Sequence, residues 1–402
     1  MVYIDRVTAE YENSLRGAEH EINLYIMPLD HWENAVAEIK ADIIRDSGNI
    51  TIAKGNGSRR SLGLTLANAA GQYTPDKNSY FWYNRKFKII AEYILPSGDA
   101  YKFSQGVYII KSSNEANGRL KISAIDKFGN LNGENKVGAV VQPFTTDISA
   151  GTIYVGDLIR ETLLRDMGNG YPIDPVAPLI DPYFDSEPLY ADITLSSGQY
   201  YGQIISQLAD MYGADTYYDA AGHLIFKRKP TYSQPAWFMH LGYVWRYKDA
   251  DETIIAGTPQ AEHLFDGVNC VTVATDNADG VVYSYTAKNQ NAESPVNVKA
   301  IGERFLSPPI RYISLGDATR EDGQEKCKQY AEYLLTEKTR DSVSETFQSI
   351  YIPHFDVDKA IRFREEDYVI DKLNINLTNR RMELKASNVA FLPSNWSVES
   401  YE

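Results

Sequence analysis

Short runs in which apolar and polar residues alternate dominate the first third of the chain. In RSLGLTLA, residues 60–67, three leucines fall on one face of an extended strand, while serine, glycine and threonine fall on the other. Further strands are expected where similar runs lie between turn residues: at 20–29, 35–46, 48–54, 86–95, 103–113 and 119–129. Regularly spaced short strands are typical of antiparallel β-domains, so residues 1–142 are predicted to form one.

The apolar pattern changes to a helical period after residue 143. Apolar residues at 155, 158, 159, 163 and 164 form one stripe of a predicted helix, and a second stripe runs through YYGQIISQLADMYG, residues 200–213. A proline-rich connection lies between these helices, and DTYYDAAGHLIFKRK, residues 215–229, has the pattern of a tight hairpin. Residues 143–255 are therefore predicted to form a smaller α+β domain.

The last part of the chain, 256–402, returns to strands around one clear helix. That helix is predicted near 320–338, where apolar residues recur every three to four positions. Strands are expected on both sides of a turn at 276–280, and again at 343–352, 367–377 and 380–392. The region is predicted to be a second β-domain, interrupted around 290–315.

Two segments far apart in the chain resemble each other. VYIIKSSNEANGRLKISA, residues 107–124, aligns with DYVIDKLNINLTNRRMELKAS, residues 367–387, so that Tyr108 matches Tyr368 and RLKISA matches RMELKA. Each segment reads as a strand, a polar turn containing Asn, and a strand beginning with Arg. The match predicts that the first and third regions are copies of one β-domain, although hairpins in general share such a pattern.

Composition narrows the class of protein. The chain has 402 residues, enough for two or three domains, and 29 of them are tyrosines, which suit half-buried strands and contact surfaces. The formal net charge of −14 argues against a dedicated nucleic-acid-binding protein, but it is compatible with a surface along which DNA passes. The sequence shows neither a signal peptide nor an apolar run of membrane-spanning length, so synthesis in a cytoplasm and no membrane-spanning segment are expected.

The stretch GNGSRRSLGLTLANAAGQYTPD, residues 55–76, resembles a phosphate-binding loop at its start. No Gly-Lys-Ser/Thr follows, and the next predicted element is a strand, whereas phosphate loops need a helix N-terminus. Residues 55–58 are therefore predicted to form a turn. Arg59 and Arg60 are predicted to begin the strand and to meet acidic neighbours or a partner subunit.

Motifs of catalysis and metal binding do not occur. The six histidines lack metal-ligand spacing, and neither cysteine has a nucleophile motif around it. Cys270 and Cys327 lie in apolar patterns, which predicts two small buried side chains. The sequence therefore predicts no catalytic, cofactor-binding or metal-binding residues, and no cofactor.

Some carboxylates leave an enzymatic function open. Asp356 with Asp358, on one face of a strand, or the run Glu365–Asp367 could be an acid–base pair of a glycosidase. Solvated charges near the start of a strand are the simpler interpretation. Asp276 and Asp279 fit a hairpin turn better than a calcium loop.

The tryptophans leave a binding function open. Trp82, Trp237 and Trp245 could form a sugar-binding platform together with nearby tyrosines. Burial in a core or an interface is the more common role of such residues.

A series of short motifs in the first domain points to a family. An Arg-rich strand runs into an L-x-N-x-x-G-x-Y-x-P turn, followed by R-K-h-x-I, Q-G-V and A-x-D-K segments on later strands. These fall at Leu66, Asn68, Gly71, Tyr73 and Pro75; at Arg85, Lys86 and Ile89; at Gln105, Gly106 and Val107; and at Ala124, Asp126 and Lys127. The pattern resembles the N-terminal domain of phage tail hub proteins, and the later helices and strands are similar to the rest of that family.

The resemblance implies a non-enzymatic structural protein of the virion, located at the tail tip or baseplate. In such hubs, two tube-type antiparallel β-barrel domains and a smaller α+β domain make up each subunit of a homotrimer. The trimer joins the sixfold tail tube or distal tail protein to a central spike, fibre or tape-measure protein, and DNA passes through its channel without specific binding. Tail-associated proteins of this kind often carry a C-terminal lytic or fibre region, and this sequence ends at SNWSVESYE, so either the spike is a separate protein or this is the hub portion alone. A tail-tip cell-wall glycosidase and a carbohydrate-binding receptor protein are the alternative functions.

Overall fold

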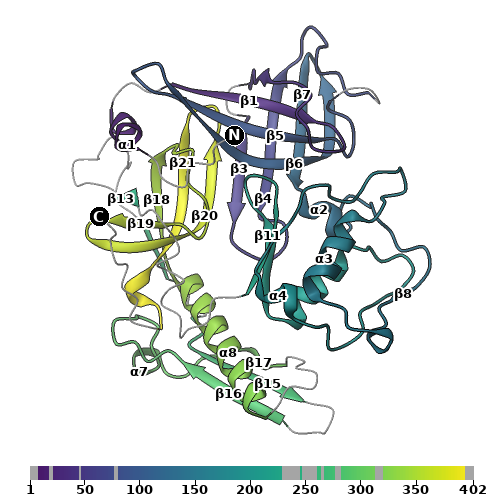
Figure 1. Ribbon diagram of the computed structural model, residues 1–402. Helices are drawn as coiled ribbons and strands as arrows, with labels where there is room; N and C mark the ends of the chain where they lie inside the picture. The colour runs from purple at the N-terminus through teal and green to yellow at the C-terminus, as the bar shows by residue number, and fades with distance from the viewer. Residues whose placement is uncertain are drawn as a thin grey trace. The chain divides into compact units, whose positions relative to one another are not determined.

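A computed structural model of the chain describes residues 8–17, 21–44, 47–76, 80–228, 245–246, 260–263, 267–276, 282–312 and 320–393. The chain divides into two compact units, and Figure 1 labels their helices and strands. The first unit contains residues 1–228, 351–355 and 374–382, and the second contains residues 229–350, 356–373 and 383–402. Each unit therefore combines segments that are distant in sequence.

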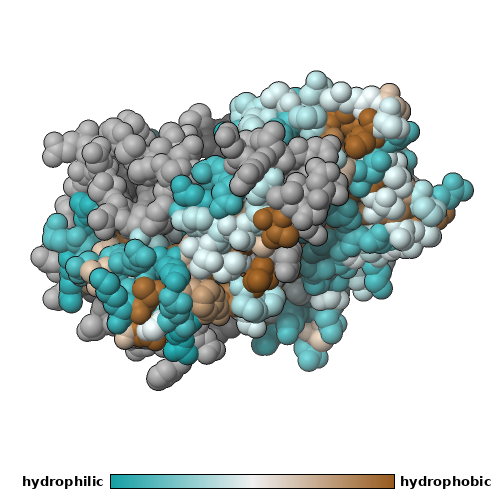
Figure 2. All heavy atoms as spheres, turned by 90° about the horizontal axis from the view of Figure 1, so that it is seen from below, coloured by the Kyte–Doolittle hydropathy of each residue, from teal (hydrophilic) through white to brown (hydrophobic). Residues whose placement is uncertain are grey.

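The surface drawn in Figure 2 mixes polar and apolar residues. Hydrophobic residues form small separate patches there, among hydrophilic and intermediate ones. Small patches of this kind are ordinary for a protein surface. In the described part of the chain, no helix combines the length and the apolar character that crossing a membrane requires.

The first unit is built on a large antiparallel sheet. Its strands lie in the order β3-β4-β7-β6-β5-β1-β2. Their bounds are β1 Glu21–Leu29, β2 Ile39–Lys40, β3 Asn49–Ala53, β4 Arg60–Ala67, β5 Lys86–Ile94, β6 Ala100–Ala116 and β7 Arg119–Asp126. The predicted β-rich fold is confirmed. Among the described residues, the strand order is a linear path that does not close into a barrel.

Alternation along β4 decides which face of this sheet is buried. Leu62, Leu64 and Leu66 are at most 2% exposed, and the residues that follow each of them are more exposed. Leu62 lies opposite Ala124 and Leu64 opposite Ile122, both buried on β7, so apolar side chains meet across neighbouring strands. The period of two that predicted a strand at 60–67 is confirmed.

A short helix in this unit, α1 (Ala9–Leu15), was not predicted. The Thr8 hydroxyl caps it by accepting a hydrogen bond from the backbone N–H of Tyr11. Tyr11 is fully buried: its ring centroid lies 4.9 Å from that of Tyr93, and its hydroxyl lies 3.1 Å from Nδ1 of His354. A helix of seven residues has little stability alone, so contacts with residues far away in sequence hold it.

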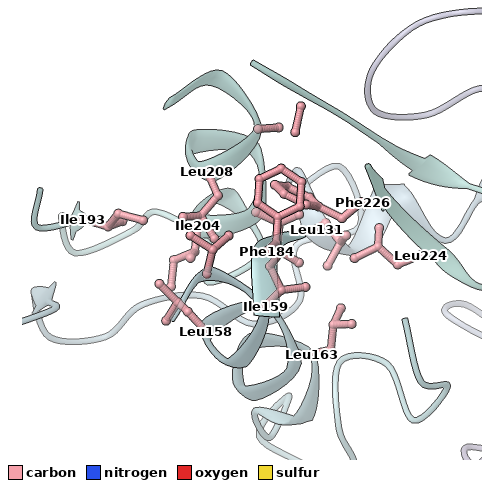
Figure 3. Packing of buried hydrophobic residues seen from close by; sticks show 14 of the residues in the cluster. Leu131, Leu158, Ile159, Leu163, Phe184, Ile193, Ile204, Leu208, Leu224 and Phe226 are labelled. Carbon is pink, nitrogen blue, oxygen red and sulfur yellow. The ribbon is translucent and has the colours of Figure 1, made fainter. Parts of the chain in front are cut away.

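The middle region of the first unit has its own apolar core (Figure 3). Its elements are α2 Phe128–Leu131, β8 Phe144–Thr145, η1 Ile148–Ala150, α3 Val155–Leu164, β9 Leu179–Ile180, α4 Tyr183–Ser186, β10 Thr194–Leu195, α5 Gln203–Met211, β11 Ala214–Tyr218 and β12 Leu224–Arg228. Side chains of α3, α5 and β12 gather around Phe184 of α4, whose ring centroid lies 4.8 Å from that of Phe226. The two helices and the hairpin predicted here are confirmed.

Helix α5 begins directly after Gly202, where only glycine fits. A Cβ atom at this position would overlap the backbone of Leu131 at the end of α2. The N-terminus of α5 therefore packs against the α2 backbone itself.

In the second unit, helix α8 (Arg320–Ser342) lies along a three-stranded sheet (Figure 1). The sheet has the order β16-β15-β17, with β15 Cys270–Asp276, β16 Val282–Lys288 and β17 Phe305–Tyr312, and α7 (Val298–Ile301) precedes β17. The core between sheet and helix contains Val271, Val273, Tyr283, Ala287, Leu306, Cys327, Ala331 and Leu335. The predicted late helix and the burial of both cysteines, which are free thiols, are confirmed.

The remaining strands form a larger group that lies mainly in the second unit, apart from residues 374–382, which belong to the first unit. The neighbours are β14-β18-β21-β20, with β19 antiparallel to β20 and β13 parallel to β19. Their bounds are β13 Trp245–Arg246, β14 Gln260–His263, β18 Val343–Ile350, β19 Ala360–Phe363, β20 Glu366–Asn376 and β21 Arg381–Asn388, and η2 (Val389–Phe391) follows. Arg340, near the end of α8, is buried, and its Nε and Nη2 lie 2.9 and 2.5 Å from Oδ1 of Asp371 on β20.

The two segments that resemble each other in sequence both lie in hairpins. Residues 107–124 lie in the β6–β7 hairpin, which turns at Asn117 and Gly118 with φ values of 52° and 68°. Residues 367–387 lie in the neighbouring strands β20 and β21. The common hairpin form is confirmed, and the duplication of a whole domain stays a prediction.

Two strand predictions were wrong in detail. Among the described residues within 35–46, only Ile39–Lys40 forms a strand, and the chain then makes a bridge from Ile43 to Leu66. Asp356 and Asp358 do not share a strand face, because they lie in a connection with turns before β19. The φ of Asp358 is 63°, which a strand does not allow. Most of the predicted turn at 276–280 lies outside the described residues, whereas its flanking strands β15 and β16 pair as predicted.

Candidate assembly surface

The segment GNGSRR, residues 55–60, is anchored inside the first unit. Arg59 and Arg60 are buried, and their backbone N–H groups donate to Oδ2 of Asp126 at 2.7 and 2.9 Å. The backbone N–H of Phe128 donates to the other oxygen of this carboxylate at 3.1 Å. Burial raises the pKa of Asp126, and the N–H donors oppose that shift. The arginines do meet an acidic neighbour, but through their backbone amides.

The side chain of Arg59 joins the large sheet to the middle region. Its guanidinium carbon lies 3.4 Å from the ring centroid of Tyr217 on β11, a cation–π contact. Beside it, Asn56 donates from Nδ2 to the carbonyl of Ala214 and accepts at Oδ1 from the N–H of Thr216, each at 3.1 Å. The glycine-rich turn therefore binds the hairpin of the same chain and leaves no cradle for phosphate.

A buried group of four charges, the charge group, lies close to this junction. Nζ of Lys127 lies 2.7 Å from Oε1 of Glu33 and 2.7 Å from Oδ1 of Asp174, and it donates to the carbonyl of Gly222 at 2.8 Å. Nζ of Lys86 lies 2.6 Å from the same Glu33 oxygen. All four side chains are at most 7% exposed, and their two positive and two negative charges balance.

Neighbouring charges fix the protonation states in the charge group. Burial favours the neutral form of Glu33, but Lys127 and Lys86 outweigh it and lower the pKa of this carboxyl. Burial, and then the Asp174 carboxylate, raise the pKa of Tyr218 well above its ordinary value. The Tyr218 hydroxyl therefore stays protonated and donates to Oδ2 of Asp174 at 2.7 Å.

No local motif revealed the charge group in the sequence, because its members come from four separate segments. Lys86 and Lys127 are nevertheless two of the positions on which the resemblance to tail hubs rests. Both lysines form buried ion pairs with Glu33, which explains why this fold needs a lysine at these two positions of the pattern.

Two loops next to the charge group expose aromatic rings. Leu29, the last residue of β1, lies opposite Lys86, the first of β5, so loops 30–36 and 80–85 leave the sheet at the same end. Trp32, Tyr83 and Trp82 are 56%, 57% and 36% exposed. These three residues, with His31 and Tyr171 beside Trp32, form what we call the aromatic surface. Trp82 is thus exposed and does not lie in a core, while its predicted burial in an interface stays a prediction.

The rings of Trp32 and His31 are held in place. His31 stacks on Tyr171 with ring centroids 4.0 Å apart, and Trp32 meets Tyr171 edge-on at 6.0 Å. The Asp30 carboxylate accepts from the backbone N–H groups of Trp32 and Asn34 at 2.9 and 2.8 Å, which fixes the loop. An ordered loop that exposes large aromatic side chains is typical of a protein contact surface.

Trp82 and Tyr83 do not form a flat platform. Their ring planes meet at 75° with centroids 5.4 Å apart. A sugar ring stacks on a flat aromatic face, so these two rings cannot hold one sugar together. The geometry favours contact with a protein.

The carboxylates considered for glycosidase chemistry make structural contacts. Asp367 accepts two hydrogen bonds from Arg362, at 2.7 and 2.8 Å. Glu366 accepts from Nδ2 of Asn388 at 2.8 Å, and Asp358 lies 3.6 Å from the buried guanidinium near the end of α8. These groups serve the packing of β19, β20 and α8.

The histidines and acidic residues do not gather either. In the described segments, no three His, Cys, Asp or Glu side chains lie close enough together to hold a metal ion. His223 lies 3.2 Å from Asp219 within its own hairpin. Several candidates fall outside the described residues or have side chains outside them: His20, Trp237, His240, Trp245, His263, Asp276 and Asp279.

Comparison with known proteins finds similarity in fold and not in sequence. No protein-family model matches the chain, and no curated protein sequence matches it. Among solved structures, the tail protein from Neisseria meningitidis MC58 has a TM-score of 0.54 at 11% identity, covering 93% of this chain and 99% of that chain. The 43 kDa tail protein of prophage MuSo2 from Shewanella oneidensis has a TM-score of 0.51 at 11% identity, covering 92% and 100%.

This chain has the fold of phage tail proteins. The resemblance to tail hubs read from the sequence is confirmed at the level of the fold. A third similar structure, the half-lidded Francisella PdpA-VgrG complex, has a TM-score of 0.50 at 11% identity and covers 97% of this chain and 62% of that chain. The tail-protein fold therefore extends over nearly the whole chain.

Proposed function

We propose that this chain is a non-enzymatic hub subunit at the tip or baseplate of a phage tail. The observation that carries the proposal is the match to the Neisseria tail protein, which covers 93% of this chain and 99% of that one. A match over almost the full length of both chains concerns the arrangement of all the elements. It goes well beyond one common β-hairpin or helix.

In this proposal the hub is a homotrimer with two tube-type β-barrel domains per subunit, at 1–142 and 256–402, and an α+β domain at 143–255. The similar hairpins β6–β7 and β20–β21 support two related domains. Three subunits with two such domains each make a pseudo-sixfold ring. One side of the ring joins the tail tube or distal tail protein, and the other joins a spike, fibre or tape-measure protein.

The aromatic surface supports contacts between subunits. Trp32, Tyr83 and Trp82 expose large rings at one end of the sheet, and such rings dominate the energy of many protein interfaces. The net charge of −14 suits a ring through which DNA passes without binding. The protein would be made in the host cytoplasm and function in the virion.

The mass in solution and the shape of the particle test this proposal together. Three chains of 45.3 kDa give about 136 kDa by light scattering, and negative-stain images are expected to show a ring with a central opening. A stable monomer that forms no rings at the highest soluble concentration contradicts the trimeric hub.

The same preparation tests the alternative functions. Release of fragments from purified cell walls, abolished by Asp367→Asn, indicates a glycosidase. Saturable binding to host cell-wall polysaccharide, abolished by Trp82→Ala, indicates a carbohydrate-binding protein. We expect neither activity.

A further inference from the structure

Strand β16 is an edge of the three-stranded sheet in the second unit. Among the described residues it pairs with β15 alone. The backbone N–H of Asn289 donates to the carbonyl of Asn269 at 2.8 Å, which marks this opposed pair as hydrogen-bonded. Hydrogen-bonded and non-hydrogen-bonded pairs alternate in an antiparallel ladder, so the backbone groups of Ala287 and Tyr285 also face β15.

The backbone groups of Ser284, Thr286 and Lys288 therefore face away from β15. Two contacts agree with this assignment. The Thr272 and Thr286 hydroxyls lie 2.9 Å apart, as expected for a closely spaced non-hydrogen-bonded pair. The carbonyl of Ser284 accepts from Nε2 of Gln324 on α8 at 2.9 Å, so this outward group already has a partner. The backbone N–H and C=O groups of Thr286 and Lys288 therefore form the open part of the edge.

A groove runs along this open part of the edge. It encloses about 1050 Å³, and it is bordered by β16, one flank of α8, the loop after β16 and the chain after η2. Tyr285 to Lys288 line it in succession, facing Glu332 and Leu335 of α8. Four residues of an extended strand span roughly 13 Å, so this β16 groove has room for a strand of similar length.

The β16 groove is acidic. Glu332 on α8 is half-buried beside the Tyr285 hydroxyl, and burial raises the pKa of its carboxyl. Glu293 adds a second carboxylate to the lining. Lys288 is the cation in the lining, and its Nζ lies 2.5 Å from Glu303, which neutralises it. Lys328, one turn before Glu332 on α8, also attracts the Glu332 carboxylate, but its Nζ lies 3.9 Å from Glu325, which balances it. A basic side chain is therefore the complement of this groove.

We propose that the β16 groove binds an extended segment of another protein, which pairs with β16 as an added strand and places a Lys or Arg beside Glu332. Edge strands bordered by a helix bind peptides in this way: the main chain supplies affinity, and alternate side chains supply specificity. In the groove, the Tyr285 and Ala287 side chains share the α8 side of the sheet and would contact every second residue of the partner.

Capped hexapeptides added to the full chain test the pairing. The probe is the sequence Thr-Val-Lys-Val-Thr-Val, with an acetyl group, an amide and a fluorescent label. Two further versions carry N-methyl groups on one or the other set of alternate amides. Only one set of amides can face β16, so one methylated peptide is expected to lose binding and the other to bind like the parent.

Variants of the groove identify the site. Thr286→Pro removes an outward N–H and no bond to β15, and it is expected to abolish binding, while the matched variant Thr286→Val is expected to leave binding unchanged. Glu332→Gln is expected to weaken binding of the lysine probe roughly fivefold, and to have no effect on a probe with Gln in place of Lys. The Glu332 comparison keeps the test valid if Thr286→Pro fails to fold.

Each other outcome overturns the proposal. Equal binding of both methylated peptides would mean that the peptide backbone does not pair with β16. Equal binding to Glu332→Gln would mean that the acidic groove is not the site. Failure of the parent probe to bind at millimolar concentration also overturns it. None of these results bears on whether the chain forms a trimer.

Discussion

Lys127 is 2% exposed, and its ammonium group lies 2.7 Å from each of two carboxylates. Lys127→Met keeps much of the side-chain volume but leaves Glu33 and Asp174 with less compensation inside the protein. Breaking a buried ion pair by removing one partner typically costs about 3–5 kcal/mol. We therefore expect the free energy of unfolding, measured in urea, to fall by about that amount.

Lys111 offers the matched control. Its Nζ lies 2.7 Å from Glu134, the same distance as in the buried pairs, but both side chains are about 40% exposed. Exposed pairs contribute about 0–1 kcal/mol, so Lys111→Met should change the free energy of unfolding by less than that. Equal losses in the two variants would mean that burial does not govern the role of Lys127.

His31 makes the first unit sensitive to acid. Burial, followed by the nearby cations Arg85 and Lys86, lowers the pKa of His31 below its ordinary value of 6.5. The unfolded chain therefore takes up the proton first, so the stabilising contribution is present above pH 6.5 and is lost as the pH falls through the lower folded pKa. His31→Phe keeps a flat ring against Tyr171 without a titrating group.

Urea unfolding between pH 7.5 and pH 5 measures this effect. The free energy of unfolding of the original chain is expected to decrease more steeply than that of His31→Phe over this range. Parallel curves would show that His31 does not titrate differently in the folded and unfolded chains.

Residue type alone predicted little about these buried charges. Arg59 and Arg60 form a basic pair next to glycines, which in isolation fits a phosphate site. Their amides instead bind Asp126, which lies 66 residues after Arg60 in the sequence. Whether these amides meet a carboxylate depends on which strands become neighbours. Asp126 ends β7, and β7 becomes the neighbour of β4 only when the whole sheet forms.

At the scale of elements, the contact between α5 and α2 leaves no room for a side chain at Gly202. Gly202→Ala forces the new Cβ against the Leu131 backbone, which cannot move as a side chain would. Overpacking of this kind typically costs about 1–3 kcal/mol, so we expect a loss of that size in the free energy of unfolding.

Gly151→Ala is the control for this substitution. A Cβ at Gly151 has no atom within 4 Å, so the change should stay within about 0.5 kcal/mol. A Gly202→Ala protein as stable as the original would show that α2 and α5 can separate at little cost.

Elements with a strong periodic pattern were predictable from sequence, whereas short ones were not. Strand 60–67 and helix α8 each bury a regular apolar face, so their pattern carries the information. Helix α1 has only seven residues, and its burial depends on His354 and Tyr93. The left-handed turn at Asp358 likewise has no pattern that a window of sequence could reveal.

At the scale of the whole molecule, the aromatic surface should matter for assembly and not for folding. Trp32 and Tyr83 are more than half exposed, so the double variant Trp32→Ala, Tyr83→Ala should change the free energy of unfolding by less than about 0.5 kcal/mol per site. Loss of two interface anchors typically costs at least about 2 kcal/mol each, which weakens association by roughly a thousandfold in total. Light scattering should then report a shift from about 136 kDa towards 45.3 kDa.

The variant Val141→Ala is the control that separates loss of the aromatic contacts from a general loss of exposed apolar surface. Val141 is 83% exposed and lies far from loops 30–36 and 80–85 in the chain, so Val141→Ala should leave the mass unchanged. A double variant that still forms the larger particle would place the subunit contacts elsewhere.

The tail-protein fold could be predicted from sequence because its evidence is spread over many strands, turns and helices. The proposed assembly surface could not be predicted, because an exposed tryptophan and a buried one look alike in sequence. Trp82 was expected to lie in a core or an interface, and in the single chain it is 36% exposed. The pairing of β1 with β5 places Leu29 opposite Lys86, and this pairing shows that the loops of Trp82 and Trp32 lie at the same end of the sheet.

The division of the chain has a consequence for its synthesis. The first unit includes residues 351–355 and 374–382, so the ribosome must translate most of the second unit, as far as residue 382, before the first can be completed. At 5–20 residues per second, the wait after residue 228 is roughly 8–30 s. During that time Gln105 lacks the carbonyl of Pro353, and Tyr11 lacks His354. The nascent protein must stay soluble with these contacts unmade, so its first unit depends on the codons for residues 351–382 to finish folding.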